Sequence, residues 1–229
     1  MAIDRELVIR TAMRLLDEDG LDKLSLRRLA AELQVKAPAL YWHFESKRAL
    51  MDHMADAVLA PALPELHDPA DPADWSSWLA HTADVLRARL LAHPDGAQLA
   101  LGANLSRAPA LRSFVERTIE VLHRAGFGLA DASRAAATFL WFVVGRTVEE
   151  QTLPDPATIR RGSARPSILS KAMAERTAPD DQDVSFRFGV RIMIAGMRAV
   201  LREAATSSAD GPGFPAADGG GSRPTWDGV

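Results

Sequence analysis

Four ring-bearing side chains, Tyr41, Trp42, His43 and Phe44, follow one another in the stretch APALYWHFESKRAL, which begins at residue 37. The phenol hydroxyl, the indole N–H and the imidazole N–H can each donate a hydrogen bond to a phosphate oxygen. Their ring faces can lie against sugars and thymine methyl groups. A packed core needs only one or two such rings, and a solvated face needs none. These residue types therefore favour a surface that contacts nucleic acid.

The rings are flanked by basic residues, although the whole chain has a formal net charge of −3. Between residues 23 and 48, two acidic residues (Glu32, Glu45) stand against six basic ones, which leaves a local charge of +4. A basic segment inside an acidic protein is typical of a nucleic-acid contact. The six basic residues are Lys23, Arg27, Arg28, Lys36, Lys47 and Arg48.

Two short helices are needed to hold the rings in place. Ser25 is an N-cap for a helix over 25–33, and Pro38 suits the first turn of a helix over 38–44, with a turn at 34–37 between them. This is the pattern of a helix-turn-helix, whose second helix enters the major groove. Its spacing points Ala37, Leu40 and Phe44 inward, and the other three rings outward. In the alternative reading, Tyr41 and Trp42 merely complete a small core.

The rest of the chain up to about residue 205 also reads as helix, and we expect an all-α protein with two helical domains. Helices are expected at 4–19, from 47 to about 58, and at 75–92, 95–102, 107–125, 131–152 and 184–205, with a loop at 153–166 followed by a short helix to about 177. The Pro-rich segment before residue 75 is expected to be a linker. The predicted units are a DNA-binding domain at 1–60, a helical domain at 61–205 and a disordered tail at 206–229.

Composition narrows the functional class further. The chain contains no cysteine, which excludes a thiol nucleophile and Cys-ligated metal, and it has no apolar run long enough for a membrane span. We expect a cytoplasmic protein with no cofactor. An enzyme is the competing class, but the sequence has no Ser/His/Asp order, Gly-rich phosphate loop or H-E-x-x-H pattern.

Residues 24–59, LSLRRLAAELQVKAPALYWHFESKRALMDHMADAVL, strongly resemble the DNA-binding domain of the TetR family of bacterial repressors. Members of that family carry a Leu-Tyr-x-His-Phe block followed by a Lys. The stretches LLAHPDGAQLALG, RAGFGLADA and VGRTVEEQ are similar to its tetracycline-repressor subgroup, so the resemblance covers roughly residues 5–205. It implies a homodimer that binds palindromic double-stranded operator DNA and is released by a small-molecule effector.

The resemblance also implies which residues contact DNA. Positions 37 and 39 hold a base-reading Gln and Thr in the tetracycline-repressor subgroup. Here both are alanine, which can touch a thymine methyl but cannot hydrogen-bond, so a different operator is expected. The expected DNA contacts are Arg27, Lys36, Ala37, Pro38, Ala39, Tyr41, Trp42, His43 and Lys47.

The effector site implied by the resemblance is altered in this chain. Position 100 holds the Mg²⁺-ligating His of the subgroup and is Ala here, whereas Glu149 keeps a carboxylate that helps to hold the metal's water. One carboxylate without its imidazole is a poor Mg²⁺ site, so we expect no metal and no Mg-tetracycline binding. The expected lining of a more apolar pocket is Trp78, Thr82, Leu86, Ala100, Ala103, Asn104, Phe114, Thr118, Phe139, Trp141, Phe142 and Glu149.

Two questions stay open at the level of sequence. The aromatic residues of the large domain can equally be packing residues, in which case that domain is only a dimerisation scaffold without an effector. The stripe from Phe186 to Leu201 can form a four-helix bundle with a second subunit, or it can close the core of its own domain.

Overall fold

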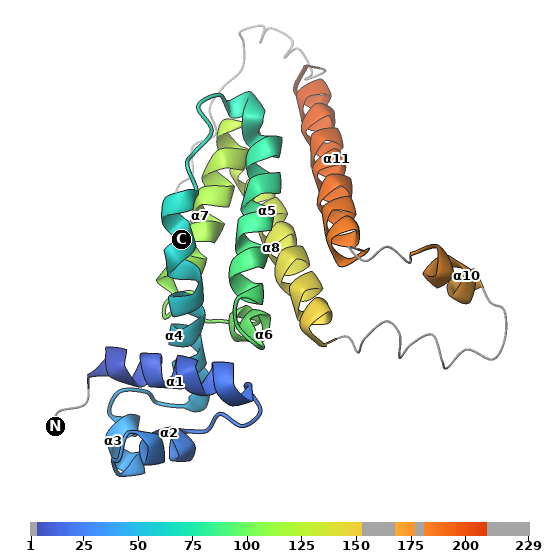
Figure 1. The fold of residues 1–229 in the computed structure, drawn as a ribbon. Coiled ribbons are helices and arrows are strands. Elements are labelled where there is room, and N and C mark those ends of the chain that lie inside the picture. Colours follow the sequence, from blue (N-terminus) through green and yellow to red (C-terminus); the bar gives the residue numbers. More distant parts are fainter. Residues whose placement is uncertain (1–3, 153–167, 177–180, 210–229) are drawn as a thin grey trace, which may run out of the picture.

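The computed structural model describes residues 4–152, 168–176 and 181–209, and every regular element in these ranges is a helix (Figure 1). Three helices form a small head at one end. Helix α4 rises from the head into a larger helical body (Figure 1). The all-α class expected from the sequence is therefore confirmed. None of the described helices has both the length and the hydropathy of a membrane span.

The head contains α1 (Arg5–Asp19), α2 (Leu26–Glu32) and α3 (Ala37–Tyr41). The side chain of Asp4 caps α1 and that of Ser25 caps α2, each accepting a hydrogen bond from a backbone N–H of the first turn. Gln34 reverses the chain between α2 and α3 with a positive φ of 54°. Helices α2 and α3, joined by this tight turn, give the helix-turn-helix.

Helix α3 is shorter than the 38–44 expected. It ends at Tyr41, and Trp42 and His43 lie in the turn that follows, where the backbone N–H groups of His43 and Phe44 both donate to the carbonyl of Leu40. Leu40 and Phe44 are almost fully buried. The chain therefore reverses around these two anchors and leaves the residues between them at the surface.

Helix α4 (Lys47–Leu59), capped by Ser46, packs against α1 of the head and also against α6 and α7 of the body. The Pro-rich stretch after it, expected to be a linker, connects α4 to α5 and is partly folded. It forms two short 3-10 helices, η1 (Ala60–Glu65) and η2 (Pro72–Asp74), and it buries Ala62 and Leu66 against the body. Local proline content predicted the loss of α-helix but not this packing.

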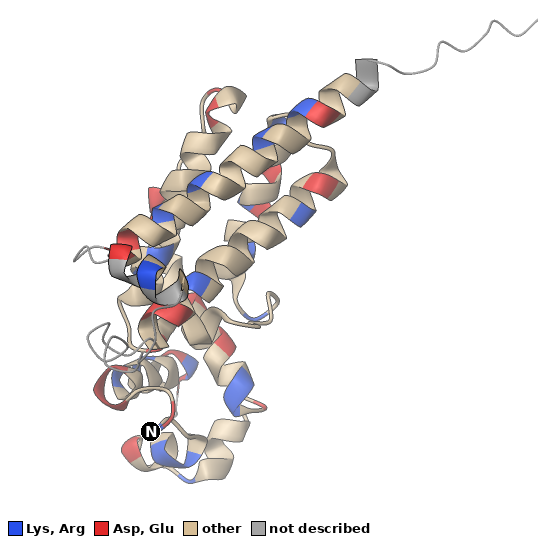
Figure 2. Cartoon of the chain, turned by 90° about the vertical axis from the view of Figure 1, so that its right-hand side faces the viewer, with Lys and Arg blue, Asp and Glu red and all other residues tan. Residues whose placement is uncertain are grey.

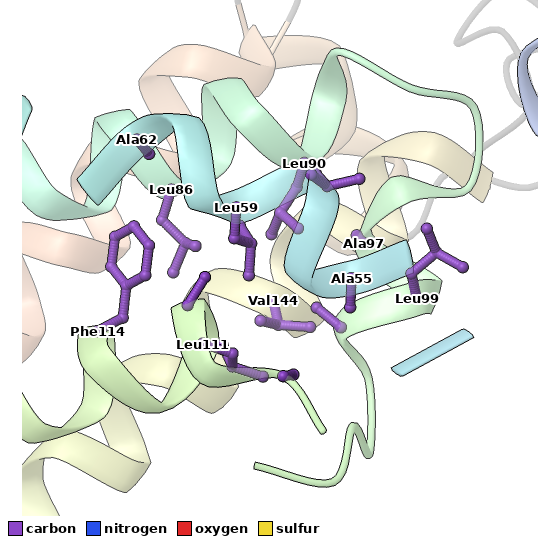
Figure 3. Packing of buried hydrophobic residues seen from close by; sticks show 14 of the residues in the cluster. Ala55, Leu59, Ala62, Leu86, Leu90, Ala97, Leu99, Leu111, Phe114 and Val144 are labelled. Carbon is purple, nitrogen blue, oxygen red and sulfur yellow. The ribbon is translucent and has the colours of Figure 1, made fainter. Parts of the chain in front are cut away.

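The body is built from α5 (Trp75–Leu91), α6 (Gly96–Ala100), α7 (Pro109–Arg124), α8 (Leu129–Thr152) and α11 (Asp181–Ala209). Its core lies where α4 to α8 meet, and Figure 3 shows side chains from all five helices converging there. Leu59 and Leu86 are almost fully buried in this cluster, as is Phe114. The short helix α10 (Ile168–Glu175) stands apart from the body (Figure 1).

The last helix, α11, continues to Ala209, four residues beyond the end expected from the sequence. The remainder of the predicted tail, 210–229, lies outside the described residues, as does the loop expected at 153–166. Along α11, Phe186, Val190 and Met197 are buried against the chain's own body. The stripe that contains them thus closes its own core, which was one of the two alternatives left open.

Candidate DNA-recognition surface and internal cavity

The ring cluster divides between core and surface as its spacing predicted. Leu40 and Phe44 are at most 1% exposed, whereas the side chains of Tyr41 and Trp42 are 56% and 90% exposed. His43 is half-buried. Large aromatic side chains are seldom left so exposed by a monomer without a binding role. The head therefore exposes the phenol of Tyr41 and the indole N–H of Trp42 at its surface, where a ligand can contact them.

The basic residues of the head differ in how freely they can meet a ligand. Arg28 and Lys23 both pair with Asp19, and Lys47 donates to the carbonyl of Leu21 at 3.2 Å. Arg27 and Lys36 are exposed and have no carboxylate partner among the described residues. The excess charge of the segment is therefore partly neutralised inside the head, and Arg27 and Lys36 remain most available.

The turn that carries the exposed rings is contacted on its inner side by residues of α1 and α4. Arg5 donates to the backbone carbonyl of His43 at 3.2 Å, and its guanidinium lies 5.7 Å from the centre of the Phe44 ring. His53 of α4 meets the same ring edge-on at 5.5 Å. Burial, and secondarily the charge of Arg5, lower the pKa of His53 below its ordinary value. The turn that carries the rings is thus held by contacts from α1 and α4.

A polar clamp joins α4 to the end of α6 and to the segment between α6 and α7. The guanidinium of Arg48 donates to the carbonyls of Leu99 and Leu101 at 3.2 and 3.1 Å, and also to the carboxylate of Asp52. Asp52 is fully buried and also accepts from the backbone N–H of Asn104 at 3.2 Å. A buried carboxylate persists only where charges and donors compensate it.

The clamp extends on both sides of this carboxylate. Arg107, in the α6–α7 segment, pairs with Glu45 at 2.9 Å and lies 3.7 Å from Asp52. One turn further along α4, Asp56 accepts from the backbone N–H of Ala110 at 2.6 Å, at the start of α7. Local sequence patterns do not reveal this clamp, which we define as Arg48, Asp52, Asp56 and Arg107. Its only local signal is the i,i+4 spacing of Arg48 and Asp52.

A second contact ties the head to the body at α1. The carboxylate of Asp95 accepts from the backbone N–H of Leu21 at 2.8 Å, and Asp17 lies 2.7 Å from Nδ1 of His93. The head is thus attached at two places, both close to α6. A displacement of α6 or of the start of α7 must reorient the head or break these bonds.

An internal cavity lies between α5, α7 and α8. It is lined by six apolar residues and two threonines, and with a volume of about 10 Å³ it has room for about one water molecule. The hydroxyl of Thr118 donates to the carbonyl of Phe114, but that of Thr82 is buried and has no hydrogen-bond partner. The lining residues are Thr82, Leu86, Phe114, Val115, Thr118, Ala136, Phe139 and Leu140.

Other residues expected at the effector site lie elsewhere in the structure. Trp141 is 57% exposed, on the outer face of α8. Phe142 packs on Phe186, with its ring over Gly189, where an added Cβ would approach it to 2.3 Å. Trp78 is buried and its indole donates to the carbonyl of His67. Spacing within α8 does not reveal that α11 covers one of its faces.

The polar and small residues expected there also lie away from the cavity lining. Glu149 is exposed and pairs with Arg146 at 2.7 Å, and Arg146 in turn donates to Gln182 of α11. Asn104 is exposed and its amide oxygen accepts from the backbone N–H of Ser106. Ala100 is buried at the end of α6, and Ala103 packs beside it on the core.

A face of α11 remains uncovered beside the outer face of α8. Exposed apolar side chains recur on it, with Phe188 52% and Ile192 55% exposed. The Arg87 guanidinium holds α11 to the body from the opposite side, through Glu150 of α8 and Asp183 at 2.7 and 2.6 Å. The uncovered apolar face consists of Val184, Phe188 and Ile192 of α11 together with Trp141 of α8.

A helix-turn-helix head with exposed rings, clamped to a helical body that encloses a cavity, defines the class of bacterial helix-turn-helix regulators. Residues 8–54 match the bacterial regulatory proteins of the tetR family, and residues 68–201 match the tetracyclin repressor-like C-terminal domain. The chain belongs to the TetR family, in its tetracycline-repressor-like branch.

Three comparisons illustrate this relationship. The class A tetracycline repressor from transposon 1721 of Escherichia coli is 36% identical, over 85% of this chain and 92% of the relative. A possible TetR family transcriptional regulator from Streptomyces coelicolor A3(2) is 38% identical with a TM-score of 0.77, covering 86% of this chain and all of that one. The structure of BioQ with its double-stranded DNA operator is 30% identical with a TM-score of 0.65, covering 86% and 99%.

Proposed function

We propose that this protein is a ligand-responsive transcriptional repressor that binds a palindromic operator as a homodimer. The observation that carries the proposal is the exposed indole and phenol of Trp42 and Tyr41 on a turn anchored by Leu40 and Phe44. Such a surface gains stability when sugar and phosphate groups cover its rings and satisfy their donors. BioQ, which has the same fold, was crystallised with double-stranded operator DNA.

In this proposal α3 enters the major groove and the phosphate contacts come mainly from Arg27, Lys36 and the donors of the ring cluster. Ala39 and Ala37 are half-buried at the start of α3, where they read at most a thymine methyl. Lys47 reaches a phosphate only by giving up its bond to the Leu21 carbonyl. Sequence preference then depends on few base contacts and on the shape of the DNA.

The dimer forms through the uncovered apolar face of α8 and α11. Its exposed rings and aliphatic side chains would be buried against the same face of a second copy, which is the self-complementary arrangement of a two-fold dimer. Two heads in a fixed relation then read two half-sites, about 34–36 Å apart for one DNA turn.

The effector binds in the cavity between α5, α7 and α8. The unpaired hydroxyl of Thr82 can hydrogen-bond to a ligand group, and the rest of the lining favours an apolar or aromatic molecule. The class A relative is a tetracycline repressor, but this lining contains no imidazole or carboxylate to hold the metal of a metal-bound drug. We therefore expect an effector other than Mg-tetracycline.

A ligand of ordinary size cannot enter without widening the cavity. This widening is the structural change by which the ligand alters DNA binding. Phe114 lines the cavity one turn after Ala110, whose backbone N–H is held by Asp56 of α4. Pushing α7 outward therefore pulls on α4 through the clamp and changes the separation of the two heads. Such coupling between sites is typically worth about 1–3 kcal/mol.

The small cavity volume also supports the alternative that the body is only a dimerisation scaffold. In that case the space near Thr82 holds one water and no effector. The two functions differ in a single observable, because a scaffold binds operator with an affinity that no small molecule changes.

The proposal is tested by fluorescence anisotropy of the full chain on DNA from upstream of its own gene, with competitor DNA present. We expect specific binding that weakens steeply with salt, by about 0.9 in the log–log slope for each neutralised phosphate. Trp42→Ala should lower the affinity about tenfold without loss of fold, because its side chain packs on almost nothing in the free protein. Arg202→Gln, at the far end of α11, is the matched control.

Two outcomes of this titration would contradict the proposal. Equal affinity for operator and competitor, after upstream and randomised duplexes have both been tried, would remove specific DNA binding. Equal affinity of wild type and Trp42→Ala would remove the ring cluster from the interface. Once binding is established, a compound that releases the DNA separates an effector-controlled repressor from a scaffold.

A further inference from the structure

A larger concavity of about 540 Å³ lies between α5 and α11. It is separate from the internal cavity. Ser76, Ala80 and Asp84 of α5 line this α5–α11 groove, whereas Thr82 and Leu86 of α5 face the internal cavity. Residues four apart share a helix face, so α5 forms a wall of both spaces with opposite sides. The volume is in the range of small-molecule sites.

The groove combines an apolar floor with an excess of positive charge. Val190 is buried in its floor, and Ile194 packs beside it. Three arginines of α11 line it against the single carboxylate of Asp84, which leaves a local charge of +2. Basic residues recur along α11 in Figure 2. This combination suits a molecule with an apolar body and a negatively charged head.

The arginines of the groove are only partly satisfied within the chain. Arg187 lies 3.8 Å from Asp84 and its side chain is 71% exposed. Arg198 donates to the hydroxyl of Ser76 at 2.7 Å. Arg191 stacks on the ring of Phe188 at 5.1 Å and has no carboxylate partner in the described ranges. Its guanidinium donors are therefore available to an incoming anion.

The groove is also distinct from the uncovered apolar face. On α11, Gly189 meets Phe142 of α8, while Phe188 and Ile192 are exposed. The groove lies on the other side of α11, where Arg187, Val190 and Ile194 face α5. A dimer that covers Phe188 and Ile192 thus leaves Arg187, Val190 and Ile194 next to α5 for a ligand. Arg191, which stacks on Phe188, lies at the border of the two surfaces.

We propose that the α5–α11 groove is a second small-molecule site, which binds an organic anion whose carboxylate is held by Arg191 and Arg187 and whose apolar body lies on Val190 and Ile194. It goes beyond the effector cavity of the proposed function, because it needs neither that cavity to open nor DNA to be bound. Its ligand class is also different, namely an organic anion with an apolar body, whereas the lining of the internal cavity carries no charged group.

Isothermal titration calorimetry of the full chain with decanoate tests the proposal, with decanol and decyltrimethylammonium as probes that share the tail. We expect one decanoate per chain and weaker binding in high salt, because the groove is open to solvent. Arg191→Gln should weaken decanoate binding about tenfold, as expected for loss of a charged hydrogen bond. Arg202→Gln, an exposed arginine of the same helix outside the groove, should bind as wild type does.

Several results would overturn the proposal, and they are distinct from failure of operator binding, which anisotropy measures on the same preparations. One is the absence of decanoate binding to wild type, and another is equal binding of decanol or of the ammonium probe. A third is a loss in Arg202→Gln that matches the loss in Arg191→Gln. Finally, Thr82→Val should leave decanoate affinity unchanged, and a selective loss there would assign the anion to the internal cavity.

Discussion

At the scale of single residues, the molecule leaves a few side chains without the partners that burial or exposure normally requires. Trp42 is an apolar ring in water, and Thr82 has a buried hydroxyl without a hydrogen-bond partner among the described residues. An exposed ring gains when a ligand covers it, and a buried donor gains when a ligand bonds to it. Trp42 and Thr82 lie at the two places where the proposed function requires DNA and an effector to bind.

Replacing Thr82 by valine tests the role of its unpaired hydroxyl. The substitution removes a buried, unpaired hydroxyl and keeps the shape, so the free energy of unfolding should rise by about 1 kcal/mol, while release of DNA by an effector should weaken. Urea unfolding measures the first effect. The control is Thr118→Val, which removes a hydroxyl that is bonded to the Phe114 carbonyl and should not stabilise. A loss of stability in Thr82→Val would show that its hydroxyl is already satisfied.

Sequence patterns predicted well which side chains are buried where burial depends only on the residue's own helix. The split of Leu40 and Phe44 from Tyr41 and Trp42 follows from three- and four-residue spacing, and the structure confirms it. Spacing did not predict that Trp141 is exposed and that Phe142 is covered. Both lie on α8, and only the docking of α11 about 40 residues later decides which rings are covered.

At the scale of elements, α4 is the mechanical link between the DNA-binding head and the body. It packs on α1 at one end and on α6 and α7 along its length. The cavity touches α7, and the clamp connects the start of α7 to α4. A change at the cavity can therefore reach the head through one continuous set of contacts.

Replacing Asp52 by asparagine tests this link. The variant keeps an oxygen acceptor but removes the charge that faces Arg48 and Arg107, so the free energy of unfolding should fall by about 1–3 kcal/mol. Amide hydrogen exchange should accelerate in α4 and in the α6–α7 segment more than in α8. Asp22→Asn, an exposed carboxylate of the head, serves as the control. Uniform acceleration over the whole chain would argue against a local clamp.

The elements themselves were largely predictable, because caps and breakers mark their ends. Ser25 and Ser46 begin helices as expected, and Gly20 follows the end of α1 with a φ of 76°. The clamp was not predictable, since its partners are about 50 residues apart and include backbone carbonyls of Leu99 and Leu101. Sequence spacing carries no information about such distant backbone groups.

At the scale of the whole molecule, the uncovered apolar face decides whether the protein can read a palindrome. A monomer would leave Phe188 and Ile192 in water, whereas a symmetric pair would bury both. The stripe highlighted by the sequence faces the opposite way, so the helix, but not its interacting face, was anticipated. Apolar residues on α11 serve two surfaces, and periodicity alone does not assign them.

A charge placed on this face should separate the dimer. We expect Ile192→Glu to sediment as a monomer of about half the wild-type mass and to lose most of its operator affinity, because one head alone makes half of the contacts. Analytical ultracentrifugation measures the first effect. Leu105→Glu, at an exposed apolar position on the α6–α7 segment, should remain dimeric. A dimeric Ile192→Glu would place the interface on another surface.

The most direct test of the whole account is hydroxyl-radical footprinting of the full chain on its operator. A dimer that inserts one α3 into each of two major grooves predicts two protected segments related by a two-fold axis, with centres about 34–36 Å apart. The effector should remove both protections together. A single protected segment without symmetry, or two that respond independently, would contradict a ligand-controlled dimer.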